Sequence, residues 1–218
     1  MAVTSKDKNG LGGGARRAAV WLSLTAIGLF VIQSAWKALR APWLVDDFPE
    51  ALYVKTELLP WTFPAHMVSG GLALLLVPAM ILLSRQPRWH RRLAWVTVPV
   101  VVLAGITAFP VALVAPVTPI SAWGFTVQGA LWLGLLGAGV WFIRHGQVAR
   151  HRAAMLLLAA VTSGAMFFRI FLALFAIYGH PRDYQAFYAA DAWAAWGLPL
   201  IAMAIFLKRT GAMAADPR

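Results

Sequence analysis

The sequence predicts an all-α membrane protein with six transmembrane helices, of which the second to the fifth form an up-down four-helix core. Hydrophobic residues make up 61% of the 218 residues and charged residues only 12%. Soluble domains carry about 45–50% apolar and about 25% charged residues. A soluble fold of this length could not cover so much apolar surface, so we expect the lipid bilayer to be its solvent.

The formal net charge of +11 comes from basic residues that lie in short clusters between long apolar runs. A strongly basic chain can bind nucleic acid, but clusters placed between spans are typical of membrane topology. We therefore expect no nucleic-acid partner. The absence of cysteine excludes disulfides, thiol catalysis and cysteine-ligated metals.

Two long apolar stretches need separate arguments. The first run, 18–36, is too long for the apolar part of a signal peptide, so it is taken as a helix. The stretch 93–143 holds no charged residue, yet about 20 residues span a bilayer. Pro116 and Pro119 break it into two helices. The six predicted helices are 18–36, 63–84, 93–114, 122–143, 153–178 and 191–207.

The segments between these helices are polar. Residues 1–17 are glycine-rich and basic and are expected to form a disordered tail before the transmembrane domain 18–207. Residues 208–218 form a second short tail, and 37–62 and 179–190 are expected to be loops. Lys and Arg number fourteen on the side of the two tails and four on the other side, which predicts that both termini are cytoplasmic.

His90 and His151 lie at the inner ends of the third and fifth predicted helices. An imidazole pair across a bundle is a standard set of axial ligands for one b-type haem. Arg91, Arg92 and Arg152 are available to hold its propionates. The alternative is that both histidines are ordinary interfacial residues without a ligand.

Arg169 lies inside the fifth span, where an arginine costs at least about 2.5–3.5 kcal/mol and should face the bundle and find a partner. Asp191, at the outer end of the sixth helix, is the nearest candidate by topology. With His66 near the outer end of the second helix, these residues form a predicted polar cluster. It is either a structural Arg169–Asp191 ion pair or a site for an anionic substrate, a quinone or a haem propionate.

Several of these residues carry a resemblance to a family of bacterial predicted membrane proteins, the domain-of-unknown-function family twenty-three-oh-six. It covers about residues 60–205 and implies a bacterial cytoplasmic membrane but no particular activity. The matching positions are His66, His90-Arg91, His151-Arg152, Met155 and Arg169.

The chain is more distantly similar to the ascorbate-reducible transmembrane cytochromes b. Those proteins pair histidines of the second with the fourth core helix and of the third with the fifth. His90 and His151 match one such pair, and His66 matches half of the other. The fourth helix holds no histidine, so the resemblance implies one haem or none.

Two functions from different classes remain. The leading hypothesis is a membrane electron carrier or oxidoreductase with one haem b, whose partner is a quinone or a redox protein. The alternative is haem-free: a small transporter or an assembly factor built on His66, Arg169 and Asp191, or a structural subunit of a membrane complex.

Overall fold

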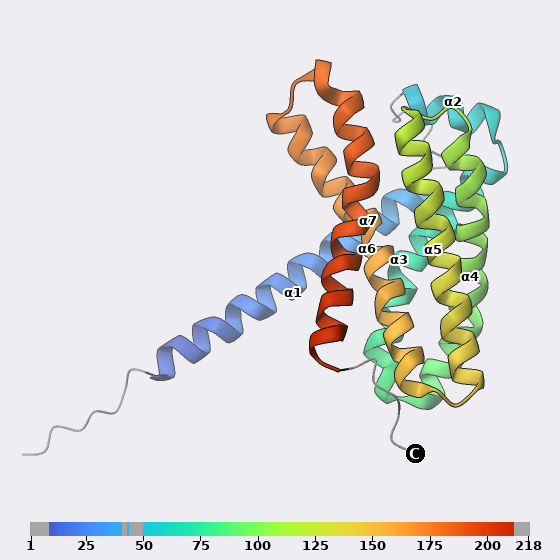
Figure 1. Cartoon of the computed structure of the whole chain (residues 1–218). Coiled ribbons are helices and arrows are strands. Elements are labelled where there is room, and N and C mark those ends of the chain that lie inside the picture. Colours follow the sequence, from blue (N-terminus) through green and yellow to red (C-terminus); the bar gives the residue numbers. More distant parts are fainter. Residues whose placement is uncertain (1–8, 41–42, 44–49, 212–218) are drawn as a thin grey trace, which may run out of the picture.

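The computed structural model describes residues 9–40, 43 and 50–211, and within them it contains helices but no strand (Figure 1). Six of the helices, α1 and α3 to α7, are long and apolar enough to cross a membrane. This confirms the predicted all-α class and the six spans. In chain order the elements are α1 (Asn9–Arg40), α2 (Glu50–Leu58), α3 (Thr62–Leu82), η3 (Leu83–Arg85), α4 (Pro87–Leu113), α5 (Pro119–Arg144), α6 (Val148–Tyr178), η4 (Pro181–Asp183) and α7 (Tyr184–Arg209).

The helices extend beyond the apolar runs that predicted them. α4 begins six residues before the expected start, because Pro87 fits the first turn of a helix, where no backbone N–H is needed. α5 begins at Pro119 behind a capping box made by Thr118 and Ser121. α1 begins at Asn9, inside the segment 1–17 that was expected to be a disordered tail. The remainder of that tail, 1–8, and residues 212–218 lie outside the described residues.

The expectation of a loop over 37–62 is wrong in part. α1 continues to Arg40, and the nine-residue helix α2 occupies Glu50–Leu58. α2 lies across one end of the bundle instead of crossing the membrane (Figure 1). It was missed because nine residues that include Lys55 and Glu57 give no long apolar run.

The predicted four-helix core is present. α3 packs against α4 and α6, and α5 packs against the same two helices, so α4 and α6 lie diagonally across a closed ring. α7 packs on α5 and α6, and α1 packs on α3. The N-terminal half of α1 projects away from the bundle (Figure 1).

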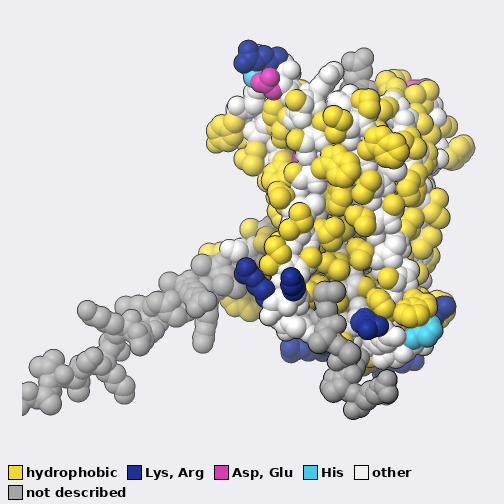
Figure 2. Space-filling view, viewed as in Figure 1, with side chains coloured by type: hydrophobic (Ala, Val, Ile, Leu, Met, Phe, Trp, Pro, Cys, Tyr) yellow, Lys and Arg dark blue, Asp and Glu magenta, His cyan; other side chains and the backbone are white. Residues whose placement is uncertain are grey.

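The bundle has two chemically different ends. One end carries the α3–α4 turn, the α5–α6 turn and the end of α7, and Lys and Arg side chains gather there (Figure 2). We call it the arginine-rich end, and the opposite end, covered by α2, the α2 end. Hydrophobic side chains dominate the surface between the two ends (Figure 2).

An apolar layer joins the four core helices between the two ends. We call it the central apolar layer. It excludes water from the middle of the bundle. Its buried members are Ala73, Val77, Val101, Leu136 and Leu158.

α5 and α7 approach each other closely at Gly124. A Cβ atom added there would lie 2.8 Å from the backbone oxygen of Ala192 and 3.0 Å from Nε1 of Trp193. Trp193 in turn donates a hydrogen bond from Nε1 to the Ile120 oxygen of α5, at 3.1 Å. The absence of a side chain at Gly124 therefore allows α7 to pack on the core.

Gly124→Ala should lower the free energy of unfolding by about 1–3 kcal/mol, because the obstructing atom is backbone and cannot turn aside. The matched control is Gly134→Ala on the same helix, where an added Cβ meets nothing within 4 Å. The control should be neutral or stabilising by up to about 1 kcal/mol. Thermal unfolding in detergent, followed by circular dichroism, measures both; equal effects would contradict the close approach of α5 and α7.

Candidate functional site

A cavity of the described structure lies between the central apolar layer and the α2 end. Its volume is about 260 Å³, and its wall includes residues from all seven α-helices. We call it the α2-side cavity. The polar or charged side chains that line it are Lys55, His66, Ser121, Gln128, Trp132, Thr162, Arg169 and Tyr188.

His66 is held in this wall by the neighbouring helix. Its Nδ1 lies 3.0 Å from the backbone oxygen of Ala104 on α4 and 3.3 Å from the hydroxyl of Thr107. A carbonyl only accepts hydrogen bonds, so Nδ1 carries the proton and Nε2 of the neutral ring is an acceptor. His66 therefore lies near the N-terminal end of α3, with polar partners on α4.

Arg169 lines the same cavity from α6. Its Nη1 donates a hydrogen bond of 2.6 Å to the backbone oxygen of Ala165, one turn back on its own helix. A guanidinium has five N–H donors in a planar fork, and no other bond of this side chain occurs among the described residues. Most of its donors therefore remain for a molecule in the cavity.

Asp191 does not form the expected ion pair with Arg169. Its side chain is buried, and neither carboxyl oxygen has a hydrogen-bond partner within the described residues. It is also absent from the cavity lining. In the described part of the chain the close ion pair is between Arg182 and Asp183, both exposed at the α2 end. Sequence spacing gives the depth of Arg169 and Asp191, but contact also depends on the direction each faces around its helix.

Lys55 is a residue of this site that the sequence did not single out. It belongs to α2, and its Nζ donates hydrogen bonds of 2.6 and 2.7 Å to the backbone oxygens of Val111 and Val114. These oxygens lie at the C-terminal end of α4, where carbonyls have no partner within the helix. The ammonium group thus fixes α2 over the cavity, and burial lowers the pKa of Lys55 below its ordinary value. Only an amphipathic reading of residues 50–58 as a helix could have indicated this role.

A second candidate site lies at the arginine-rich end. His90 and His151 are each the fourth residue of their helices, the diagonal pair α4 and α6. Their ring centroids are 6.5 Å apart and the ring planes are perpendicular. The structure therefore brings together the two histidines that the sequence paired.

Both rings of this pair are oriented by backbone carbonyls. Nδ1 of His90 lies 3.0 Å from the Met80 oxygen on α3, and Nδ1 of His151 lies 2.8 Å from the Gly139 oxygen on α5. Each Nδ1 must be the donor, which leaves each Nε2 unprotonated in the neutral ring. We call these two residues the histidine pair.

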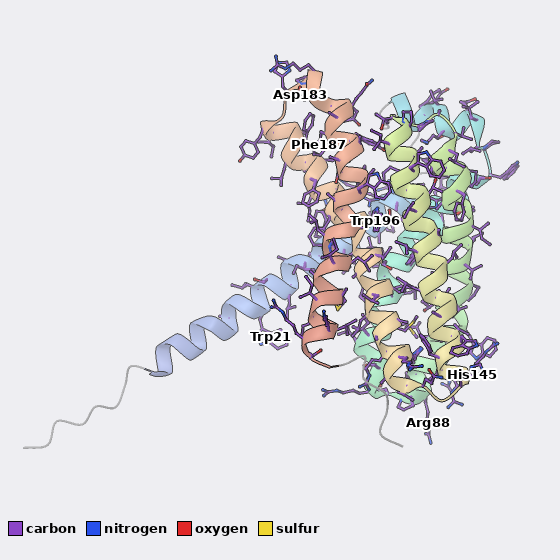
Figure 3. All side chains as sticks on the ribbon, in the orientation of Figure 1. Trp21, Arg88, His145, Asp183, Phe187 and Trp196 are labelled. Atoms are coloured by element: carbon purple, nitrogen blue, oxygen red, sulfur yellow. The ribbon has the colours of Figure 1, made fainter. Side chains whose placement is uncertain are left out.

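The other two histidines lie apart from the pair. His145 is exposed, stacks on Trp141 at 4.2 Å between centroids and is seen at the arginine-rich edge (Figure 3). His180 is exposed at the α2 end, where its Nδ1 accepts a hydrogen bond from the backbone N–H of Arg182. Neither carries a structural signal of ligand binding.

Arg91, Arg92 and Arg152 are exposed around the histidine pair. The guanidinium of Arg92 lies over the ring of Trp89, 5.3 Å from its centroid. Within the described residues no three His, Cys, Asp or Glu side chains gather closely enough to hold a metal ion.

The second site and most of the first fall within one matching region. The family model described as "Predicted membrane protein (DUF2306)" matches residues 63–207, about two thirds of the chain. The chain belongs to this family. The family region contains the histidine pair, His66 and Arg169, whereas α1, α2 and Lys55 precede it. No curated protein and no solved structure matches the chain.

Lys55→Ala should lower the free energy of unfolding by about 1–3 kcal/mol, because two charge-assisted hydrogen bonds are lost and two carbonyls of α4 are left without them. Lys37→Ala, which removes an exposed lysine of α1, is the control and should change stability by less than about 0.5 kcal/mol. Chemical unfolding of the two variants in detergent makes the comparison. Similar losses in both would show that Lys55 does not anchor α2.

Proposed function

We propose that this DUF2306 protein is a membrane electron carrier that holds one b-type haem between His90 and His151. The observation that carries the proposal is the geometry of the histidine pair. Its two perpendicular rings lie next to each other on diagonal helices, and their Nδ1 atoms are already engaged by backbone carbonyls.

The spacing suits two ligands of one metal ion. An imidazole nitrogen binds a metal at about 2 Å, so two rings on opposite sides of an ion have centroids about 6 Å apart. The observed separation is 6.5 Å. Metal-bound histidines usually donate their other N–H to a carbonyl or carboxylate, which fixes the tautomer and the ring orientation. Both rings of the pair have this second bond.

A macrocycle also needs room between the helices. The α2-side cavity does not reach the pair, so binding would require the side chains and helix ends around the pair to move apart. The end of the Met155 side chain occupies the space beside Gly139. Methionine is unbranched and adapts easily to a new neighbour, and Ala154 and Gly139 contribute little bulk at this level.

A bound haem b supplies one-electron chemistry. The protein's own part is to orient both imidazoles, because the backbone oxygens of Met80 and Gly139 hold the two Nδ1 atoms and leave each Nε2 available to a ligand. Arg91, Arg92 and Arg152 would hold the propionates by charge-assisted hydrogen bonds. The remaining basic surface attracts an acidic partner, so a redox protein with an acidic docking face, or a quinone at the interface, would exchange electrons there.

The proposed location is the bacterial cytoplasmic membrane, with the arginine-rich end and both termini on the cytoplasmic side. The support is the excess of Lys and Arg in the turns of that end, because short loops rich in these residues remain inside. The family region supports the membrane location by its description alone.

The haem proposal predicts a specific spectrum. Protein expressed with ample haem and purified in detergent should show a low-spin b-type absorption spectrum that sharpens on reduction. His90→Ala or His151→Ala should abolish or strongly weaken it, because each removes one of the two side chains that would hold the haem. The controls His145→Ala and His180→Ala should retain it, since those rings lie apart from the pair. A colourless protein, or a spectrum that survives in the double His90/His151 variant, would rule the haem site out.

The orientation can be tested without the haem. A reporter active only in the periplasm should be inactive when fused after Arg218 and active when inserted between η4 and α7, beside Asp183. Such an insertion point is exposed at the α2 end (Figure 3). The opposite pattern would place the arginine-rich end outside.

A further inference from the structure

The α2-side cavity has an unbalanced charge. Lys55 and Arg169 line it, and no acidic side chain is part of the described lining. Lys55 already donates to two carbonyls. Arg169 has a single described hydrogen bond, to its own helix, although a cation at membrane depth is normally paired.

Arg169 is the group best placed to hold a ligand. It lies nine residues from the end of α6 at Tyr178, or about 13 Å along the helix at 1.5 Å per residue. At that depth water is scarce, so N–H groups of Arg169 without a partner are energetically costly. An acceptor that enters the cavity is therefore bound strongly. A planar fork of N–H groups matches the two oxygens of a carboxylate better than any single acceptor.

The walls beside Arg169 are aromatic. Phe125, Phe168 and Tyr188 come from α5, α6 and α7, and their rings meet edge to face at centroid distances of 5.4, 6.1 and 5.3 Å. All three line the cavity. Such a wall suits the apolar body of a ligand and offers few further polar contacts.

We propose that the α2-side cavity binds a small organic acid, with its carboxylate on Arg169 and its apolar body against the aromatic wall. The proposal is independent of the haem. His66, in the cavity, and Met80, beside the histidine pair, are fourteen residues apart on α3, which is about 21 Å. The central apolar layer lies between the two sites. The acid enters either from water, as an aromatic acid, or from the bilayer, as an aliphatic acid.

The experiment uses the full-length protein in detergent and two probes, benzoate and octanoate, which represent these two sources. Benzyl alcohol and octanol are the uncharged counterparts. Isothermal titration calorimetry gives the dissociation constant of each probe. Saturable binding of at least one acid, with its alcohol at least about tenfold weaker, is expected because the charge-assisted bonds are lost.

The structure offers matched variants. A Cβ added at Gly70 meets nothing within 4 Å, and Gly70 lines the cavity. Gly70→Leu should therefore fill the cavity without disturbing the fold and abolish binding. Gly134 also has open space around it but is exposed on the bundle surface, so Gly134→Leu should leave binding unchanged.

The role of the positive charge on Arg169 is also tested with matched variants. Arg169→Gln should weaken binding of the acid at least about tenfold, and Arg169→Lys should restore only part of it, because lysine keeps the charge but not the fork. Arg182→Gln removes an exposed arginine that follows the same helix and should have no effect. Absence of saturable binding by both acids, equal binding of acid and alcohol, or full binding in Gly70→Leu would overturn the proposal, whatever the haem spectrum shows.

Discussion

The central apolar layer is the constraint on which the two polar sites depend. Its members come from α3, α4, α5 and α6, so one contact region fixes all four core helices relative to one another. In a bilayer the helices gain little from hiding apolar surface, and their association relies on close packing and on hydrogen bonds between helices. Because this layer is dry and closely packed, any polar group of the core must lie on one side of it or the other.

Histidine side chains on both sides of the central apolar layer are held by the same kind of hydrogen bond. His66, His90 and His151 each donate their Nδ1 proton to a carbonyl of a neighbouring helix. Each bond satisfies a buried donor and also fixes a ring between two helices. The bond recurs at matching places in the α3–α4 and α5–α6 hairpins, where His90 and His151 are each the fourth residue of their helices.

Much of this arrangement follows from the sequence. Charge-free runs and proline breaks determine the spans, since only helices with satisfied backbones cross a bilayer. The histidine pair was predictable because His90 and His151 share an end of the bundle and occupy alternate helices. α2 and Lys55 were not, because a nine-residue helix on the bundle end leaves no hydropathy signal. The Arg169–Asp191 contact was expected from depth alone, and depth does not give the direction that each side chain faces around its helix.

The boundary of the family region divides the cavity into two parts with different roles. The cavity lining from Phe63 to Ala195 belongs to the region that the family model matches, whereas Lys55 and α2 precede it. Lys55 donates its hydrogen bonds to the end of α4 and not into the cavity, so its main effect is to hold α2 in place over the cavity. Arg169 donates one hydrogen bond to its own helix, and no partner of its other N–H groups occurs among the described residues. The proposed ligand recognition would then reside in the part of this chain that the family model matches, and the cover over the cavity would lie in the segment before it.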